Sequence, residues 1–454
     1  MVELLAVSVY HPSNPTDSEL VSPVYDTLSD ADLLRFSKTP YNAAGFVARP
    51  SSMPLAEFLE RAPRRLQEAI AAEVYRRDPV PSLYVYGIRY TPPADILEAL
   101  PTSNRRTEYL LLGLVGALDL AHTPEWSIAR HEKAFPERIE ERVRLTEATG
   151  MHFAPIMAGY TLINHAVNDL LEKTLGLDRR EMALEGTAPP IVRAKLDGSE
   201  HRLWRLDDPT VQTRITELIA PLRILILDGH HRYAAARELL RRGRPGSSPL
   251  VMLVESRDLA LHLLPWHRAL SPGTATLNEL RTRAGARFVS IEGMGSRPSI
   301  TDLIAELDRM FRRHERGFLA VGPEGSWRYR GPDSTDGGFD FDLLHGYLEE
   351  EFHRDPHDFG VFRSPRLAIE SVRTPGTPWS DGVAFLLPKL REEAVEERAF
   401  ATGRVMAHKS TMFLPKVAEG VLFASTSPIP SAPPRGTANR SNRADLSQGP
   451  IRPA

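Results

Sequence analysis

The chain contains no cysteine, which excludes disulfides, thiolate metal sites and cysteine nucleophiles. No apolar run approaches the roughly eighteen residues that a membrane span needs, and the first residues lack the basic start and long apolar stretch of a signal peptide. A net charge of −3 does not indicate a broad basic surface that could bind nucleic acid. We therefore expect a cytoplasmic protein without a membrane partner, and nucleic acid is not an expected partner either.

Three familiar chemical signatures are also missing. The sequence has no Gly-x-x-x-x-Gly-Lys loop, no dinucleotide-binding fingerprint and no Gly-x-Ser-x-Gly elbow. The composition is that of a soluble globular protein, with 42% hydrophobic and 25% charged residues. At 454 residues the chain is longer than one compact domain usually is.

The most informative segment is Asp-Gly-His-His-Arg-Tyr, residues Asp228 to Tyr233. It follows the apolar run Ile224–Leu227, which predicts a buried strand, and precedes residues 234–240, which favour a helix. A strand, a glycine turn and a helix start leave backbone N–H groups free, and phosphate oxygens bind at such places. The guanidinium of Arg232 also suits phosphate. The carboxylate of Asp228 could hold a metal or a proton.

Strands and helices are expected to alternate along the rest of the chain, which predicts an α+β (mixed α/β) fold with a mixed sheet. The residues from 425 onward have almost nothing to bury, so residues 425–454 are expected to be a disordered tail. The expected strands are 83–90, 110–120, 154–160, two strands within 191–206, 249–255 and 261–264. The expected helices are 54–77, 136–149, 164–175, 210–219, 277–288 and 300–313.

Five segments together resemble a bacterial and archaeal family of proteins of unknown function. The resemblance extends over about residues 23–423. The run Ile224–Leu240 is also similar to the nucleotide-binding turn of the ParB/sulfiredoxin-like superfamily, and the Asp-Gly-His-His-Arg within it most resembles the free L-serine kinases. The five segments are Pro23–Asp26, His131–Glu132, Asp228–Tyr233, Leu264–Arg268 and His408–Lys416.

This resemblance implies a ParB/sulfiredoxin-like core with additions at both ends. The core is expected at residues 110–270, with an insertion at about 160–219. An N-terminal α/β extension would occupy residues 1–109, and a C-terminal α/β region would occupy residues 271–424.

The resemblance also implies a function, namely phosphoryl transfer from ADP or ATP to free L-serine or a close hydroxy amino acid, with Mg²⁺. In the serine kinases, a glutamate in a His-Glu context is taken as the base that activates the serine hydroxyl, and Glu132 is the matching residue here. Without the resemblance, Glu132 reads as a carboxylate favoured by the dipole at a helix start.

Phosphoryl transfer needs a cradle for phosphates, a cation and a base or orienting group. The expected cradle is Gly229, His230, His231 and Arg232. Asp228 is expected to act in catalysis and as a Mg²⁺ ligand. Alternatively, it could bind the substrate amine or share the role of proton acceptor. Further contacts to substrate or phosphate are expected from Tyr25, Asp26, His131, His267, Arg268, Lys409, Ser410, Thr411 and Lys416.

Two other readings stay open. The chain could be a nucleotide-binding regulator, gated by CTP or ATP like the DNA-partitioning relatives, that lacks kinase activity. It could also be a nuclease or a structural regulator that kept the fold and lost the chemistry. The near-neutral charge and the lack of an evident helix-turn-helix weigh against a DNA-associated role.

Overall fold

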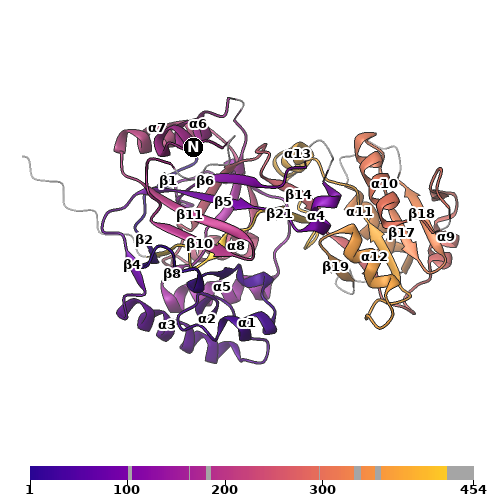
Figure 1. Ribbon diagram of the computed structural model, residues 1–454, viewed down its shortest axis with the longest axis horizontal. Helices are drawn as coiled ribbons and strands as arrows, with labels where there is room; N and C mark the ends of the chain where they lie inside the picture. Colours follow the sequence, from indigo (N-terminus) through magenta and orange to yellow (C-terminus); the bar gives the residue numbers. More distant parts are fainter. Residues whose placement is uncertain are drawn as a thin grey trace, which may run out of the picture.

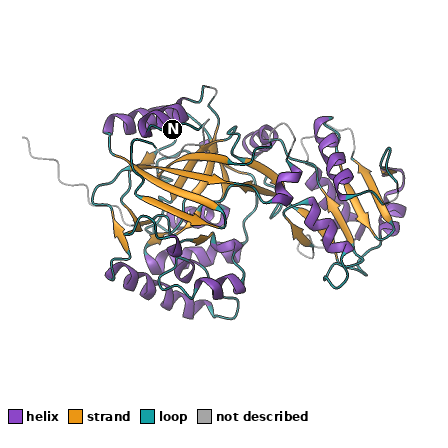
Figure 2. Cartoon of the chain, in the orientation of Figure 1, coloured by secondary structure: helices purple, strands orange, loops and turns teal. Residues whose placement is uncertain are grey.

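The computed structural model describes residues 1–100, 105–162, 164–179, 186–295, 297–331, 339–352 and 359–426. The chain forms a larger body and a smaller body that lie side by side (Figure 1). Each is built around a sheet with helices outside it (Figure 2). The expected mixed α/β fold is confirmed. None of the described helices has the length and apolar character to cross a membrane.

A nine-stranded mixed sheet forms the centre of the larger body. Strand β12 pairs with β7 and strand β13 pairs with β9 in parallel, while the other pairs are antiparallel. The order is β10 (Val192–Leu196), β11 (Ser199–Leu206), β5 (Leu83–Tyr90), β6 (Tyr109–Leu118), β13 (Leu250–Glu255), β9 (Ile156–Tyr160), β12 (Ile224–Asp228) and β7 (Ile128–Arg130), and β1 (Leu4–Leu5) pairs with β6.

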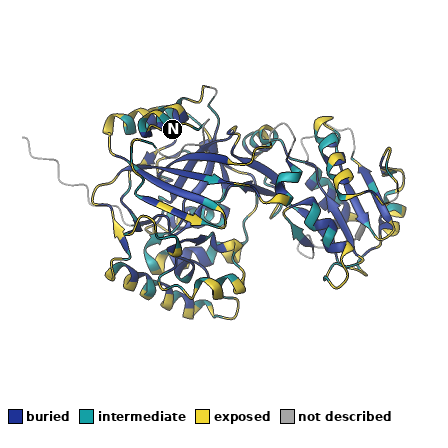
Figure 3. Cartoon of the chain, viewed as in Figure 1, coloured by how far each residue is buried: buried dark blue, intermediate teal, exposed yellow. Residues whose placement is uncertain are grey.

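The central strands β6, β13 and β9 of this sheet are buried along their whole length, whereas β10 at its edge alternates between buried and exposed residues (Figure 3). Along β12, Ile224 and Ile226 pack towards α6 (Ala166–Leu175), α7 (Pro209–Ile219) and α8 (His230–Arg241). The alternate residues Leu225 and Leu227 face a second core. That core contains side chains from β14 (His262–Pro265), β21 (Thr411–Leu414) and residues 417–424.

Strands from the first and last parts of the described chain pair with one another outside this sheet. Strand β3 pairs with β22, and β2 lies between β4 and β23. Helix α5 packs between α8 and α3. The elements are β2 (Val9–Pro12), η1 (Ser18–Leu20), β3 (Ser22–Pro23), η2 (Tyr25–Thr27), α1 (Asp30–Phe36), α2 (Ala44–Val47), α3 (Leu55–Ala71), β4 (Tyr75–Arg77), α5 (Pro136–Thr149), β8 (Met151–His152), β22 (Ala418–Glu419) and β23 (Phe423–Ser425).

The smaller body contains a six-stranded antiparallel sheet in the order β16-β18-β17-β20-β15-β19. Helix α4 (Ala94–Ala99) of the larger body contacts its helices. Its elements are β15 (His267–Leu270), α9 (Leu277–Ala284), β16 (Phe288–Ser290), α10 (Ile300–Arg312), β17 (Gly317–Gly322), β18 (Gly325–Arg330), α11 (Asp340–Phe352), β19 (Gly360–Phe362), α12 (Pro365–Arg373) and β20 (Val383–Leu386), and α13 (Glu392–Thr402) leads back to the larger body.

Two helices are shorter than the hydrophobic pattern predicts. The helix expected at 54–77 ends at Ala71, because Glu73 adopts a left-handed conformation and the chain continues as β4. The helix expected at 277–288 ends at Ala284, next to Gly285 with a positive φ. The predicted helix at 136–149 coincides with α5.

The sheets also bear on how the chain divides. The expected boundary between residues 109 and 110 falls inside β6, which pairs along its whole length with β5 of the expected N-terminal extension. The hairpin β10–β11 of the expected insertion extends the same sheet. We therefore propose that residues 266–387 form one unit and that the chain before and after them forms the other. The expected tail lies outside the described residues from 427 onward.

Candidate active site at the ends of β7 and β12

The turn between β12 and α8 needs a glycine. Gly229 adopts φ +86°, and a Cβ on it would lie 2.8 Å from Nη2 of Arg232. No side chain in the described part of the chain caps α8, so the N–H groups of its first turn are free to bind an anion. The expected strand–glycine–helix arrangement is therefore present.

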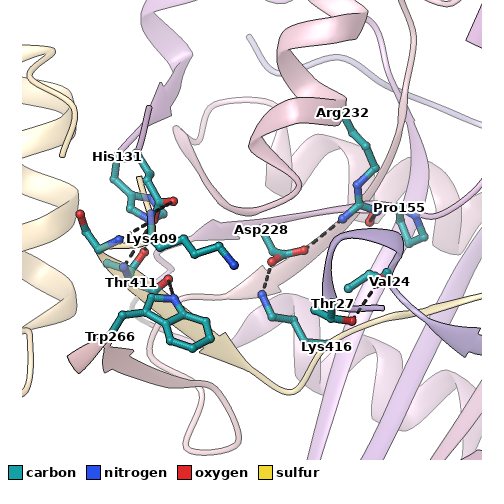
Figure 4. A network of polar contacts seen from close by, with 12 residues as sticks. Val24, Thr27, His131, Pro155, Asp228, Arg232, Trp266, Lys409, Thr411 and Lys416 are labelled. Atoms are coloured by element: carbon teal, nitrogen blue, oxygen red, sulfur yellow. Dashed lines mark hydrogen bonds and ion pairs between the residues drawn. The ribbon is translucent and has the colours of Figure 1, made fainter. Parts of the chain in front are cut away.

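Asp228 lies between two cations at the end of β12 (Figure 4). One carboxylate oxygen pairs with Lys416, and the other accepts a hydrogen bond of 3.0 Å from Nη2 of Arg232. Burial by itself raises the pKa of Asp228, but Lys416 and Arg232 outweigh it and hold this pKa at about 2. Arg232 also donates to the carbonyls of Ala154 and Pro155, at 3.2 and 2.9 Å. It thus ties the turn to the chain before β9, and its phosphate-binding role stays a prediction.

A Mg²⁺ ion does not fit Asp228 in this arrangement. Both carboxylate oxygens face cations, and Lys416 or Arg232 would have to withdraw before a metal could approach. Among the described residues, no three or more His, Asp or Glu side chains are grouped so that they could hold a metal ion. Asp228 therefore serves here as an anchor for two cations, and its role as a metal ligand stays a prediction.

Glu132 lies at the same edge of the sheet as Asp228. Strands β7 and β12 are parallel neighbours, with Arg130 opposite Ile226. Asp228 is the last residue of β12, and Glu132 comes two residues after the end of β7. The expected insertion at 160–219 leaves after β9 and returns before β12, so it does not separate them.

The carboxylate of Glu132 is held by the turn formed by residues 408–411. Its Oε1 accepts from the N–H of Lys409 at 2.6 Å, and its Oε2 accepts from the N–H groups of Ser410 and Thr411 and from the Thr411 hydroxyl, at 3.2 to 3.4 Å. Burial raises the pKa of Glu132 to about 6, and these donors limit the rise. A carboxylate with this pKa is suited to accept a proton near neutral pH.

Lys409 connects the two halves of the site. Its backbone adopts a left-handed conformation, with φ +52°, which is uncommon for a residue other than glycine. Its side chain points from the turn towards Asp228 (Figure 4), and its Nζ lies 5.5 Å from the centre of the Trp266 ring. The Trp266 indole donates to the Thr411 carbonyl at 2.9 Å, which fixes the end of the turn.

Three of the histidines here, His131, His230 and His231, are neutral at pH 7. His131 forms a hydrogen bond of 2.7 Å with the Thr411 hydroxyl and meets the ring of His230 edge-on, with centroids 4.6 Å apart. Burial lowers the pKa of His131 to about 4 and that of His230 well below its usual value. His231 accepts from the N–H of Phe135 at 3.1 Å, and burial lowers its pKa to about 4. These three histidines therefore add no positive charge to the site.

Two expected contacts lie in η2, beside α8. Tyr25 is buried under the Arg142 guanidinium, 4.0 Å from the ring centre, and Asp26 is exposed. Glu419 is a further candidate that no sequence pattern singled out. It is buried near Arg142 and Arg232, and its Oε2 has no hydrogen-bond partner among the described residues. Burial raises the pKa of Glu419 to about 7. Its position three residues after Lys416 is the signal that could have drawn attention to it.

Successive residues of β15 point in opposite directions. Arg268 reaches the 408–411 turn and donates to the Lys409 carbonyl at 2.7 Å. His267 accepts from the N–H of Leu387 at 3.1 Å, inside the smaller body. The structure therefore brings Glu132, Asp228 and the expected residues of the segment 409–416 to the ends of β7 and β12. Tyr25 and Asp26 lie in η2, and His267 has a partner within the smaller body.

The chain belongs to the family described as "Protein of unknown function (DUF1015)", which matches residues 8–343. This confirms the expected family of unknown function, and the match covers four of the five segments, since His408–Lys416 lies beyond residue 343. No curated protein matches the chain.

Three solved structures are distantly similar. A free serine kinase mutant in complex with ADP is 15% identical with a TM-score of 0.35, over 63% of this chain and 84% of that chain. SbnI from Staphylococcus aureus, with a C-terminal truncation, is 12% identical with a TM-score of 0.36, over 67% and 85%. A conserved hypothetical protein from Pyrococcus furiosus is 14% identical with a TM-score of 0.32, over 63% and 87%.

Proposed function

We propose that the protein is a phosphotransferase that moves a phosphoryl group from ADP or ATP to the hydroxyl of free L-serine or a close hydroxy amino acid. The observation that supports this proposal is that the required chemical groups lie close together in the fold. Glu132, a carboxylate with a raised pKa, is held by the turn that carries Lys409. Lys409 and Lys416 lie near Asp228, which directly precedes the uncapped start of α8, although these parts come from distant parts of the sequence (Figure 4). These are the parts that phosphoryl transfer needs.

The phosphates would bind at the first turn of α8, next to Lys409 and Lys416. The free N–H groups and the helix dipole attract the phosphate oxygens, and the lysines add charge. Lys416 would exchange part of its contact with Asp228 for phosphate. Mg²⁺ would enter with the nucleotide, because it prefers phosphate oxygens and retained waters.

In the transfer step, the substrate hydroxyl oxygen attacks the terminal phosphorus. A bond forms between these two atoms, and the bond from phosphorus to the bridging oxygen breaks. The electron pair of that bond leaves with the nucleotide, as ADP from ATP or AMP from ADP. Glu132 accepts the hydroxyl proton, which makes the weak hydroxyl nucleophile effective.

The test is to incubate the purified protein with Mg²⁺, with ADP or ATP, and with each amino acid in turn. Phosphorus NMR and mass spectrometry would detect the phosphorylated product. We expect O-phosphoserine or the phosphate ester of a close analogue. If nucleotide binds while every amino acid stays unmodified, the kinase proposal fails, and the nucleotide-gated regulator becomes the better account.

A further inference from the structure

Arg268 is a buried arginine whose hydrogen-bond acceptors are backbone carbonyls. It lies in β15 of the smaller body, 2% exposed, with its guanidinium 4.9 Å from the centre of the Phe341 ring. Its Nη2 donates to the carbonyls of Lys409 and His408, at 2.7 and 3.4 Å. The smaller body thus reaches into the turn that holds Glu132.

Arg268 and Glu132 bind opposite ends of the same two peptide groups. The His408 carbonyl and the Lys409 N–H belong to one peptide unit, and the Lys409 carbonyl and the next N–H belong to the second. Arg268 binds the two oxygens, and Glu132 binds the two N–H groups. Each peptide dipole is therefore aligned between a cation and an anion, and hydrogen bonds in such a chain strengthen one another.

The backbone of the turn also needs this support. Lys409 is left-handed at φ +52°, a strained conformation for a residue with a side chain, and it persists only when its surroundings hold it. The Ser410 hydroxyl donates to the carbonyl of Ala407 at 2.6 Å and adds a local restraint. If Arg268 is lost, the turn is free to relax and to withdraw its N–H groups from Glu132.

We propose that Arg268 is a positioning residue that acts on Glu132 through the 408–411 turn and sets the pH range in which Glu132 can accept a proton. This rests on the proposed function, in which Glu132 is the base. The role proposed for Arg268 also assigns a function to the smaller body, because that body supplies the residue that holds the base in place.

The groups that face Glu132 define what a pH experiment reports. Arg268 approaches from β15 and Lys409 from the turn, and His131 is the neighbour on its own strand. His131 is neutral above about pH 4. Lysine and arginine stay charged near pH 6. Glu419, the other buried carboxyl near Arg232, has a pKa of about 7, so the limb that persists in Glu419→Gln is the one that reports Glu132.

The experiment compares the pH dependence of kcat for the wild type with that of Arg268→Gln, Arg268→Lys and a matched control. Without Arg268 the carboxylate loses donors and a nearby positive charge, so its pKa rises. We expect the acidic limb of Arg268→Gln to move to higher pH, with kcat about tenfold lower at pH 6 and nearly restored at pH 9. Arg268→Lys keeps the charge, so we expect its acidic limb to lie between that of the wild type and that of Arg268→Gln.

The control is Arg328→Gln, which removes another buried arginine of the smaller body, one that pairs with Glu315 at 2.9 Å. It should leave the acidic limb in place. A fall in kcat of Arg268→Gln by the same factor at every pH overturns the proposal, because that result indicates a structural role alone. If Arg268→Gln does not fold, Ser410→Ala loosens the same turn and should move the limb in the same direction, and an unmoved limb overturns the proposal.

A second readout separates this inference from the proposed function. Carbon NMR of ¹³C-labelled glutamate, with the signal assigned by its loss in Glu132→Gln, gives the pKa of Glu132 without any turnover. Should the wild type transfer no phosphoryl group, the proposed function fails, yet Arg268→Gln must still raise this pKa. An unchanged pKa overturns the role of Arg268 itself.

Discussion

At the scale of single residues, Glu132 is the group whose chemistry the site determines most closely. If it is the base, Glu132→Gln removes the proton acceptor but keeps the size and one acceptor oxygen for the 408–411 turn. We expect kcat to fall about 10² to 10⁴-fold, with nucleotide affinity unchanged because the phosphates bind at α8. Steady-state assays and calorimetric titration with nucleotide measure the two effects.

The matched control for that variant is Glu306→Gln, which changes another buried glutamate, paired with Arg309 at 2.6 Å in the smaller body. Its kcat should stay near that of the wild type. Loss of nucleotide binding in Glu132→Gln would instead place Glu132 in the phosphate site.

The same carboxylate makes stability depend on pH. The pKa of Glu132 is about 6 when folded and 4.5 in its unperturbed state, so the folded protein binds this proton more tightly than the unfolded chain does. The stability that this group contributes is fully present below pH 4.5 and is lost as pH rises through 6, about 2 kcal/mol in all. Glu132→Gln lacks this loss, so its free energy of unfolding relative to the wild type should increase between pH 4 and pH 7. Urea unfolding of both proteins between pH 4 and pH 7 checks this prediction. A difference in the free energy of unfolding that stays constant over this range would contradict it.

At the scale of elements, the turn from β12 to α8 depends on Gly229. Gly229→Ala introduces strain at φ +86° and a contact of 2.8 Å with Arg232, which would push the guanidinium away from Asp228. We expect a loss of about 1 to 3 kcal/mol in the free energy of unfolding and at least tenfold weaker nucleotide binding. Chemical unfolding and nucleotide titration provide the measurements.

Gly198 offers a control for the strain alone. It has φ +82° in the β10–β11 turn, and a Cβ there meets nothing within 4 Å. Gly198→Ala should therefore destabilise the fold to a smaller degree and leave nucleotide affinity intact. Equal affinities in the two alanine variants would show that the β12–α8 turn does not bind nucleotide.

The elements and the pairings differ in how far the sequence could predict them. Helix α5 and strand β5 follow from their periodic patterns, and the turn at Gly229 follows from its local chemistry. The hydrogen-bond partners of the two carboxylates could not be predicted in this way, because Lys416 lies 188 residues from Asp228 and Lys409 lies 277 residues from Glu132. One sequence carries no signal for contacts at such separations. The resemblance placed these residues in one family pattern without indicating which atoms meet.

At the scale of the whole molecule, a site shared between two bodies needs an interface that keeps them in register. Two bidentate ion pairs cross it between α4 and the start of α12. Arg363 binds Asp95 at 3.0 and 3.1 Å, and Arg366 binds Glu98 at 2.8 and 3.1 Å. Both pairs are partly exposed, so each contributes at most about 1 kcal/mol.

Reversing both arginines, Arg363→Glu with Arg366→Glu, puts like charges in contact across this interface. We expect the free energy of unfolding to fall by about 1 to 2 kcal/mol, and the partner changes Asp95→Arg and Glu98→Arg to restore most of it. Urea unfolding measures both. Arg312→Glu is the control, because its partner Asp308 lies in the same helix. If the variant with all four changes is as unstable as the variant with the two arginine changes alone, the ion pairs do not couple the two bodies. In that case Arg268 must hold its position through the apolar packing of β15.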